Sequence, residues 1–266
     1  MSVRQDEQGF MEHYPRQADL FEFDDEVARA FDDMAERSIP MYRAQHELHC
    51  EMALRHALDY NSNATDNYCV LDVGCSTGNF MKQMFDSYTE SEMLRHLYMV
   101  GLDPSGPMCD IANAKLDEVN STSHATYRIE QSGVEGLRNI PDYVKFDAVN
   151  MSYVFQFLPV GRRHLVFRDL HRILKPNGIL IISQKFTYRD NSSDSVIIDD
   201  LVQNAYIDFR LANGYSISEI EAKNRALKNA MWLQSDIDFR GQISSFGFRV
   251  YPITRWLSFG SYLAIK

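Results

Sequence analysis

Residues 70–79 read VLDVGCSTGN, a short apolar run that leads into an acidic residue and a glycine-flanked turn. The apolar run predicts a buried strand, and the turn is typical of a strand that passes directly into a helix. Gly74 has no Cβ, so bare backbone can approach a ligand there, and Gly78 lets the chain bend and the helix pack. The stretch therefore predicts a ligand site at the carboxyl end of a strand.

Predicted strands and helices alternate along the rest of the chain. Strands are expected at 68–73, 98–102, 125–130, 146–151 and 178–183, with two closing strands at 248–253 and 258–265. Helices are expected at 21–34, 41–60, 106–120 and 162–174, with two or three more within 195–242. This alternation predicts an α/β fold with a doubly wound, mostly parallel sheet, whose ligands bind beyond the carboxyl ends of the strands. Gly74, Asp103, Ser132 and Ser152 fall at or near such ends.

Composition narrows the class of protein. The net charge of −10 argues against a long polyanion such as tRNA as a direct partner. The four cysteines, at 50, 69, 75 and 109, form no CxxC pair and indicate reduced thiols in a cytoplasmic protein. No apolar run approaches the roughly 18 residues of a membrane span, and residues 1–19 lack a signal-peptide pattern. We expect a cytoplasmic protein with no membrane partner.

The turn differs from a dinucleotide-binding fingerprint. That fingerprint requires Gly-x-Gly-x-x-Gly, whereas Ser76 takes the second glycine position here and Asn79 the third. Asp103 ends the next predicted strand, where a carboxylate can accept both hydroxyls of a free ribose. Together with the Lys-Pro-Asn-Gly turn at 175–178, these features resemble those of class I S-adenosylmethionine (SAM) enzymes.

Several stretches resemble one SAM family more narrowly, the carboxy-S-adenosylmethionine synthases of the tRNA wobble-uridine pathway. They are FDDEVA (23–28), RSIPMY (37–42), QFL (156–158), SQKF (183–186), ANGYS (212–216) and FGS (259–261). The resemblance implies a Rossmann-like, seven-stranded fold with an N-terminal helical lid, SAM as cosubstrate or sole substrate, no metal, and a homodimer. It divides the chain into a flexible N-terminus (1–20) and one SAM-binding catalytic domain (21–266). That domain comprises a helical lid (21–60), a cofactor-binding core (68–185), a substrate-side helical insertion (195–242) and closing strands (248–265).

The resemblance also assigns residues to the cofactor. Tyr42 would contact it from the lid, Gly74, Cys75 and Ser76 would hold its amino-acid part, and Asp103 and Pro104 would flank the ribose and adenine. Ser132 and Gly133 would lie at the adenine. Asp72 and Ser152 complete the expected cofactor-binding set, although the family has an acidic residue at Ser132 and an Asn at Ser152.

The most informative difference between this sequence and the family concerns the Arg with which family members bind a carboxylate. A gap-free placement from Gly214 puts Asn224 at that position, and Asn cannot form the charge-assisted bidentate bond. Arg225 is adjacent and points about 100° away on a helix, so a one-residue shift of the placement would put Arg225 at the family Arg position instead. We therefore expect an altered activity, with carboxylate capture weakened at Asn224.

Aromatic residues are candidates for contact with a sulfonium, because aromatic faces attract cations. Tyr42, Tyr153, Phe155, Tyr206 and Tyr215 are expected near the pocket. We assign catalytic roles to Tyr153, Tyr206 and Asn224, with Tyr206 and Asn224 orienting a small-molecule substrate. The segment His-Glu-Leu-His-Cys at 46–50 lacks metal-ligand spacing and is interpreted as a polar helix face.

Four functions remain open. The first is methyl transfer from SAM to a small molecule. The second is the family's own reaction, which attaches a prephenate-derived carboxylate to the methyl carbon of SAM. The third uses SAM alone: its amine attacks the γ-carbon and yields azetidine-2-carboxylate and methylthioadenosine. The fourth is a non-enzymatic SAM-sensing module, which the lid segment 37–42 disfavours because a sensor has less need to exclude water.

Overall fold

A computed structural model describes residues 24–60, 67–90, 96–119, 125–189, 192–228 and 230–266. Within these ranges seven strands form one sheet in the order β3-β2-β1-β4-β5-β7-β6. They are β1 (Tyr68–Val73), β2 (Leu97–Asp103), β3 (Ala125–Gln131), β4 (Phe146–Ser152), β5 (Leu174–Lys185), β6 (Arg249–Trp256) and β7 (Phe259–Ile265). The first five are parallel, and β7 pairs antiparallel with both β5 and β6. The predicted Rossmann-like sheet is confirmed, whereas the predicted segment 1–20 lies outside the described residues.

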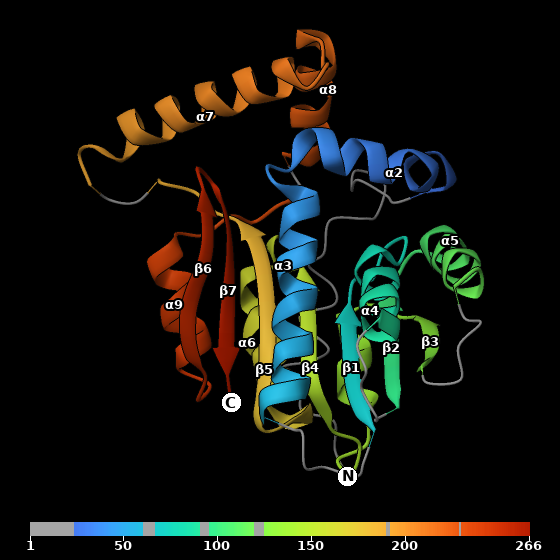
Figure 1. Cartoon of the computed structure of the whole chain (residues 1–266). Helices are drawn as coiled ribbons and strands as arrows, with labels where there is room; N and C mark the ends of the chain where they lie inside the picture. Colours follow the sequence, from blue (N-terminus) through green and yellow to red (C-terminus); the bar gives the residue numbers. More distant parts are fainter. Residues whose placement is uncertain (1–23, 61–66, 91–95, 120–124, 190–191, 229) are drawn as a thin grey trace, which may run out of the picture.

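The strand order of the sheet reverses at β1, near its centre. β1 pairs with β2 on one side and with β4 on the other, so the turn that follows β1 lies at the switch point of the sheet. In Figure 1 the carboxyl ends of the parallel strands point to the upper edge, and α2 (Asp25–Ser38) passes above them near α7 (Ser195–Ala212) and α8 (Ile217–Leu227). Helices that are far apart in the sequence, α2 on one hand and α7 and α8 on the other, therefore cover the edge at which a ligand is expected.

Alternating side chains of the strands build a core on each face of the sheet. Leu71 and Val73 of β1 belong to a core that includes Phe167 of α6 (Arg163–Ile173) and Phe239 of α9 (Asp236–Ser244). Val70 faces the other core, beneath α3 (Tyr42–Arg55) and α4 (Asn79–Glu90). The remaining helix, α5 (Gly106–Asp117), follows β2, and α3 continues as a π-helical turn, His56–Tyr60. Both faces are thus covered, as a parallel sheet requires.

The first helix begins as the sequence indicates. The side chain of Asp24, one of the two predicted capping residues, accepts hydrogen bonds from the backbone N–H groups of Glu26 and Val27 at 3.1 and 3.0 Å. The turn expected at 175–178 lies inside β5 rather than before it. Pairing there jumps from Phe146–Leu174 to Ala148–Ile179, so the turn forms a bulge in a continuous strand.

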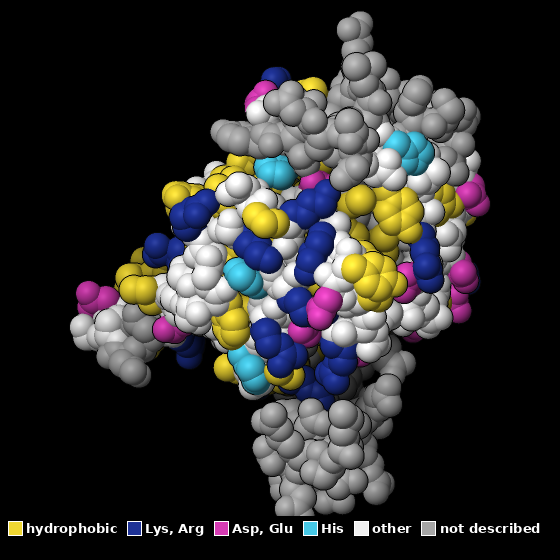
Figure 2. Space-filling view, turned by 90° about the horizontal axis from the view of Figure 1, so that it is seen from below, with side chains coloured by type: hydrophobic (Ala, Val, Ile, Leu, Met, Phe, Trp, Pro, Cys, Tyr) yellow, Lys and Arg dark blue, Asp and Glu magenta, His cyan; other side chains and the backbone are white. Residues whose placement is uncertain are grey.

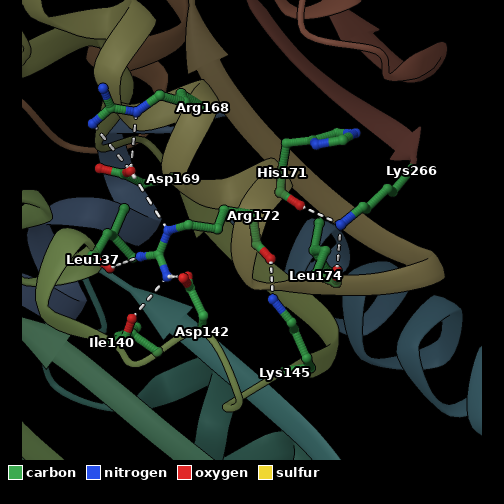
Figure 3. Close-up of polar contacts among 10 residues, drawn as sticks. All are labelled: Leu137, Ile140, Asp142, Lys145, Arg168, Asp169, His171, Arg172, Leu174 and Lys266. Carbon is green, nitrogen blue, oxygen red and sulfur yellow. Dashed lines mark hydrogen bonds and ion pairs between the residues drawn. The ribbon is translucent and has the colours of Figure 1, made fainter.

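Lys and Arg side chains gather on the underside of the molecule (Figure 2). Two lysines donate hydrogen bonds to carbonyl groups at the C-terminus of α6. Lys145 Nζ donates to the carbonyl of Arg172 at 2.7 Å, and Lys266 Nζ donates to those of His171 and Leu174 at 2.6 and 2.7 Å. Figure 3 shows these contacts together with the bonds from the Arg172 guanidinium to two carbonyls and Asp142. These cations satisfy carbonyls at a helix C-terminus, where positive charge is favourable.

A substitution at Gly74 tests whether the turn after β1 requires a glycine. The φ of Gly74 is +72°, and a Cβ built there would collide with Cγ2 of Val154, whose β-branched side chain has little freedom to move. We expect Gly74→Ala to lower the free energy of unfolding by about 2–4 kcal/mol, measured by urea denaturation. Gly241→Ala is the matched control, because Gly241 lies in α9 with open space around it. That change should be neutral or raise stability by up to about 1 kcal/mol; equal losses in both variants would contradict the interpretation.

Candidate functional site

The turn between β1 and α4 adopts left-handed backbone at three residues. The φ angles of Gly74, Ser76 and Gly78 are +72°, +50° and +78°. The N–H groups of Gly74 and Cys75 both donate to the carbonyl of Leu102, at 2.7 and 3.0 Å, so the turn is joined to β2. The missing Cβ atoms let Val154 pack against Gly74 and Ala112 of α5 pack against Gly78, and the backbone of Gly74, Cys75 and Ser76 lines the edge of the sheet.

Asp103 links the ends of β1 and β2. One oxygen of its carboxylate accepts from the N–H of Ser76 and the other from the N–H of Ser105, each at 2.9 Å. Burial raises the pKa of Asp103, and the two N–H bonds oppose that rise. Each oxygen keeps further acceptor capacity. The expected ribose anchor therefore lies at the cavity with both oxygens fixed in orientation.

Asp72, the last polar residue of β1, lies beneath the turn. Its side chain is buried and accepts a hydrogen bond from Asn150 Nδ2 at 2.7 Å. Burial raises the pKa of Asp72 to about 7, the Asn150 bond lowers it, and the charge of Asp103 adds to the rise. Asn150 on β4 was not among the predicted site residues, although it lies two residues before Ser152, which was.

A hydrogen-bond cluster ties the lid helix α2 to the turn. Asp32 of α2 accepts bonds from Thr77 Oγ1 and Asn79 Nδ2, at 2.5 and 2.8 Å. Lys115 of α5 donates to Asp32 at 2.9 Å and to Asn79 Oδ1 at 2.5 Å. These bonds and the Lys115 charge lower the pKa of Asp32 against the opposing effect of burial, which is the largest single influence. Helix α2, the predicted lid, is therefore held against the β1–α4 turn by an ionic contact that also involves α5.

A cavity of about 400 Å³ opens between this turn and the helices above it. It is lined by all but one of the predicted site residues: Tyr42, Asp72, Gly74, Cys75, Ser76, Asp103, Pro104, Ser132, Gly133, Ser152, Tyr153 and Tyr206. The glycine turn, the oriented carboxylate of Asp103 and the aromatic walls match the chemistry of a nucleoside that carries a sulfonium and an amino acid. The residues present thus fit SAM. Their individual roles stay predictions.

Asn224 is the exception, because it does not line the cavity. Its Oδ1 accepts a hydrogen bond from Arg210 Nη1 at 3.0 Å. Lys223, one residue earlier, lines the cavity, and the exposed Arg225 lies 4.0 Å from Glu221. Asn224, the residue expected to orient the substrate, therefore lies outside the cavity lining, and the rotation of α8 turns Lys223 toward the cavity instead.

Three cations in fact gather around Tyr206. Lys185 Nζ lies over the Tyr206 ring, 4.6 Å from its centroid, and the Arg210 guanidinium lies 4.3 Å from that centroid. Lys223 Nζ donates to Ser38 Oγ at 2.9 Å. Burial lowers the pKa of Lys185 and of Lys223 to about 8, and the neighbouring charge of Arg210 lowers both further. Among the described residues, neither lysine forms an ion pair with a carboxylate, so this cationic wall is available to an anionic ligand.

A buried polar network, which the sequence pattern did not predict, lies behind Tyr153 of the cavity wall. Tyr153, with φ of +60°, donates to Gln45 Oε1 at 2.6 Å, and Ser261 Oγ donates to the same oxygen at 3.0 Å. Ser261 is joined to Ser183, and Ser183 to His49. Burial lowers the pKa of His49 to about 3, so its ring is neutral. Within the 46–50 segment, predicted as a polar helix face, His49 and Cys50 are buried and Glu47 is exposed. No metal-ligating cluster occurs among the described residues.

Of the remaining aromatic candidates, the ring of Phe155 is fully buried in the core, and Tyr215 packs beside the cavity with its hydroxyl donating to Met34 O at 3.3 Å.

None of the helices in the described ranges has the length and apolarity needed to cross a bilayer.

Comparison with known proteins agrees with this geometry. The methyltransferase-domain family profile matches residues 71–180. Magnesium protoporphyrin IX methyltransferase from Synechocystis, solved with bound SAM, superposes with a TM-score of 0.53 over 100% of this chain and 99% of that protein, at 14% identity, which shows the fold. The fold and family define a class I SAM-dependent transferase.

The relatives narrow the class further. Carboxy-S-adenosyl-L-methionine synthase from Campylobacter hominis is 31% identical over 248 residues, covering 92% of this chain and 94% of the relative. The enzyme of that name from Desulforapulum autotrophicum is 30% identical over 247 residues, covering 92% and 91%. The chain belongs to the carboxy-S-adenosyl-L-methionine synthase family.

Asp103 provides a direct test of the site. We expect Asp103→Ala to weaken SAM binding at least about tenfold in calorimetry, because both ribose acceptors and the Ser76 N–H bond are lost. Asp110→Ala, an exposed change on α5, is the control and should bind SAM as the wild type does. Unchanged affinity in Asp103→Ala would contradict the assignment.

Proposed function

We propose that this protein transfers the methyl group of SAM to a small molecule that carries a carboxylate. The observation that supports the proposal is a pair of cavity-lining lysines, Lys185 and Lys223, with Arg210 behind the ring of Tyr206. A partly buried ammonium without a carboxylate partner is costly, and a carboxylate ligand would offset that cost. SAM when bound supplies an activated methyl group on a sulfonium.

The residues of the chain then have separate tasks. Asp103 and the glycine turn hold the nucleoside and amino-acid parts, and the cationic wall orients the acceptor through its carboxylate. The Asp32 contact keeps α2 over the cavity and so excludes water. Catalysis of this kind depends on alignment and water exclusion more than on a nucleophilic side chain. Tyr153 and Tyr206 are proposed as the aromatic groups closest to the reacting centre.

Synthesis of carboxy-SAM is a second candidate. The relatives that share about 30% identity are named for it, and the same cationic wall would suit a carboxylate attached to the methyl carbon. The cyclisation of SAM to azetidine-2-carboxylate gives the cationic wall no second substrate to bind. A sensing module has no need of a wall that binds a second substrate.

One experiment separates these functions. The protein is incubated with SAM alone and with SAM plus individual small carboxylic acids, prephenate among them, and the products are identified by mass spectrometry. We expect S-adenosylhomocysteine and an acid heavier by one methylene group. Carboxy-SAM formed with prephenate would select the second candidate, and methylthioadenosine formed from SAM alone would select cyclisation. Intact SAM in every mixture would contradict an enzymatic function. Asp103→Ala is the negative control.

The cationic wall makes a further prediction. Lys185→Met should weaken binding of the carboxylic acid that is methylated about tenfold, measured on the protein with S-adenosylhomocysteine bound. The reason is that a charge-assisted hydrogen bond contributes roughly 1.5–3 kcal/mol. Wild-type affinity should fall as pH rises through about 8, where Lys185 and Lys223 lose the charge that grips the carboxylate. Lys228→Met, an exposed change at the end of α8, is the control. Equal calorimetric affinity in Lys185→Met and the wild type would contradict the assignment.

We also propose that the protein forms a homodimer. The support is a set of exposed apolar side chains on α7, among them Val196, Ile197 and Leu201, at 53%, 62% and 65% exposure, since such a patch is typical of a contact surface. The cytoplasmic location and the lack of direct nucleic-acid and membrane partners stay predictions.

A further inference from the structure

His46 is a cavity-lining residue to which the proposed function gives no task. It lies one turn after Tyr42 on α3, and the two rings meet edge to face with centroids 4.5 Å apart. Both residues line the cavity with Asn79 of the cofactor turn. The Nδ1 atom of His46 is buried and has no hydrogen-bond partner within the part of the chain that the structure describes. Because a buried polar atom without a partner costs roughly 1–3 kcal/mol, its place in a cavity wall indicates contact with a ligand.

The ring of His46 is neutral. Burial lowers its pKa to about 4, the charge of Asp32 opposes that effect, and Lys115 adds to it. The nearby ring of His49, at 6.4 Å, is neutral as well. A neutral imidazole offers one nitrogen as an acceptor and carries a proton on the other. His46 therefore suits a ligand that donates an N–H group to the wall.

The surrounding charge favours a cationic donor at this end of the cavity. The carboxylates of Asp32 and Asp72 both act on Tyr42, the neighbour of His46, and add to the effect of burial in raising its pKa to about 12. The lysines of the cationic wall lie near Tyr206 instead. Lys115 pairs with Asp32 and lowers the pKa of His46, so the cavity-lining carboxylate of Asp72 is the group that favours a positive charge at this end. An anionic group is favoured beside Tyr206 instead.

We propose that His46 Nδ1 accepts a hydrogen bond from the α-ammonium group of SAM held over the cofactor turn. This inference rests on the proposed use of SAM and adds a residue that selects a cofactor with an intact amino group. Tyr42 connects the two sides of this site, because it forms a side-chain hydrogen bond with Asn79 and packs against the His46 ring. The amino-acid part of a cofactor held at the turn would lie beside them. The His46 ring is then the acceptor, with its proton on Nε2.

The contact also bears on the reaction. His46 is a much weaker base than an alkyl amine, so the proton stays on the ammonium of the cofactor. An ammonium has no free electron pair with which to attack the γ-carbon. A contact of this kind therefore works against ring closure and favours transfer to a second molecule.

The test compares two ligands that differ only in the amino group, S-adenosylhomocysteine and its desamino analogue. Calorimetry should show that the wild type binds S-adenosylhomocysteine about tenfold more tightly, the range expected for one charge-assisted bond. His46→Leu should lose most of that preference and bind the desamino analogue as the wild type does. His46→Asn, whose side-chain oxygen takes the place of Nδ1, should recover it. His164→Leu, an exposed change on α6, is the control.

The outcomes separate the inference from the function on which it rests. Equal weakening of both ligands in His46→Leu would show a structural role and overturn the inference, and so would an unchanged preference. In both cases the proposed function would stand. Failure of the wild type to bind either ligand would overturn the proposed function together with the inference.

Discussion

Two carboxylates from other parts of the chain hold the turn between β1 and α4, and the rest of the site depends on this constraint. Left-handed backbone at Ser76 costs roughly 1–2 kcal/mol for a residue with a Cβ. Asp103 offsets that cost by accepting the Ser76 N–H, and Asp32 fixes the following Thr77 and Asn79. Because Asp32 belongs to the lid, the shape of the turn and the position of the lid are set together.

The cavity that results has two ends of opposite charge. Asp72 and Asp103 line the end at the cofactor turn, whereas Lys185 and Lys223 line the far wall with Arg210 behind Tyr206. A sulfonium nucleoside with an ammonium group is positive near the first end, and a carboxylate acceptor is negative at the second. Electrostatic complementarity of this kind orients both ligands before any reacting atoms meet.

The cofactor half of the site was predictable from the sequence because parallel strands end at one edge. Gly74, Asp103, Ser132 and Ser152 each follow or end a strand, so their convergence needed only the strand pattern. The bulge in β5 was not predictable, because a Lys-Pro-Asn-Gly run is equally typical of a turn between elements.

The substrate half was harder to predict because it depends on helix rotation and on packing between distant elements. A gap-free placement gave position 224, whereas the orientation of α8 turns Lys223 inward. Lys185 follows the apolar run 179–182 at the end of β5, which was a readable signal. His46 and His49 were predicted to form a polar helix face, and only the packing of α3 against the sheet shows that they point inward.

The gap-free placement of Asn224 at the position of the family Arg predicts a change in the geometry of the positive charge. An Arg presents a rigid planar fork, whereas Lys185 and Lys223 are point charges on flexible stems. Arg210 lies over Tyr206, where its guanidinium is fixed by the Asn224 side chain. A second guanidinium at position 224 would repel it, while the amide accepts its N–H. The wall thus keeps its attraction for a carboxylate and loses the planar, bidentate constraint, which suits an anionic substrate of different shape.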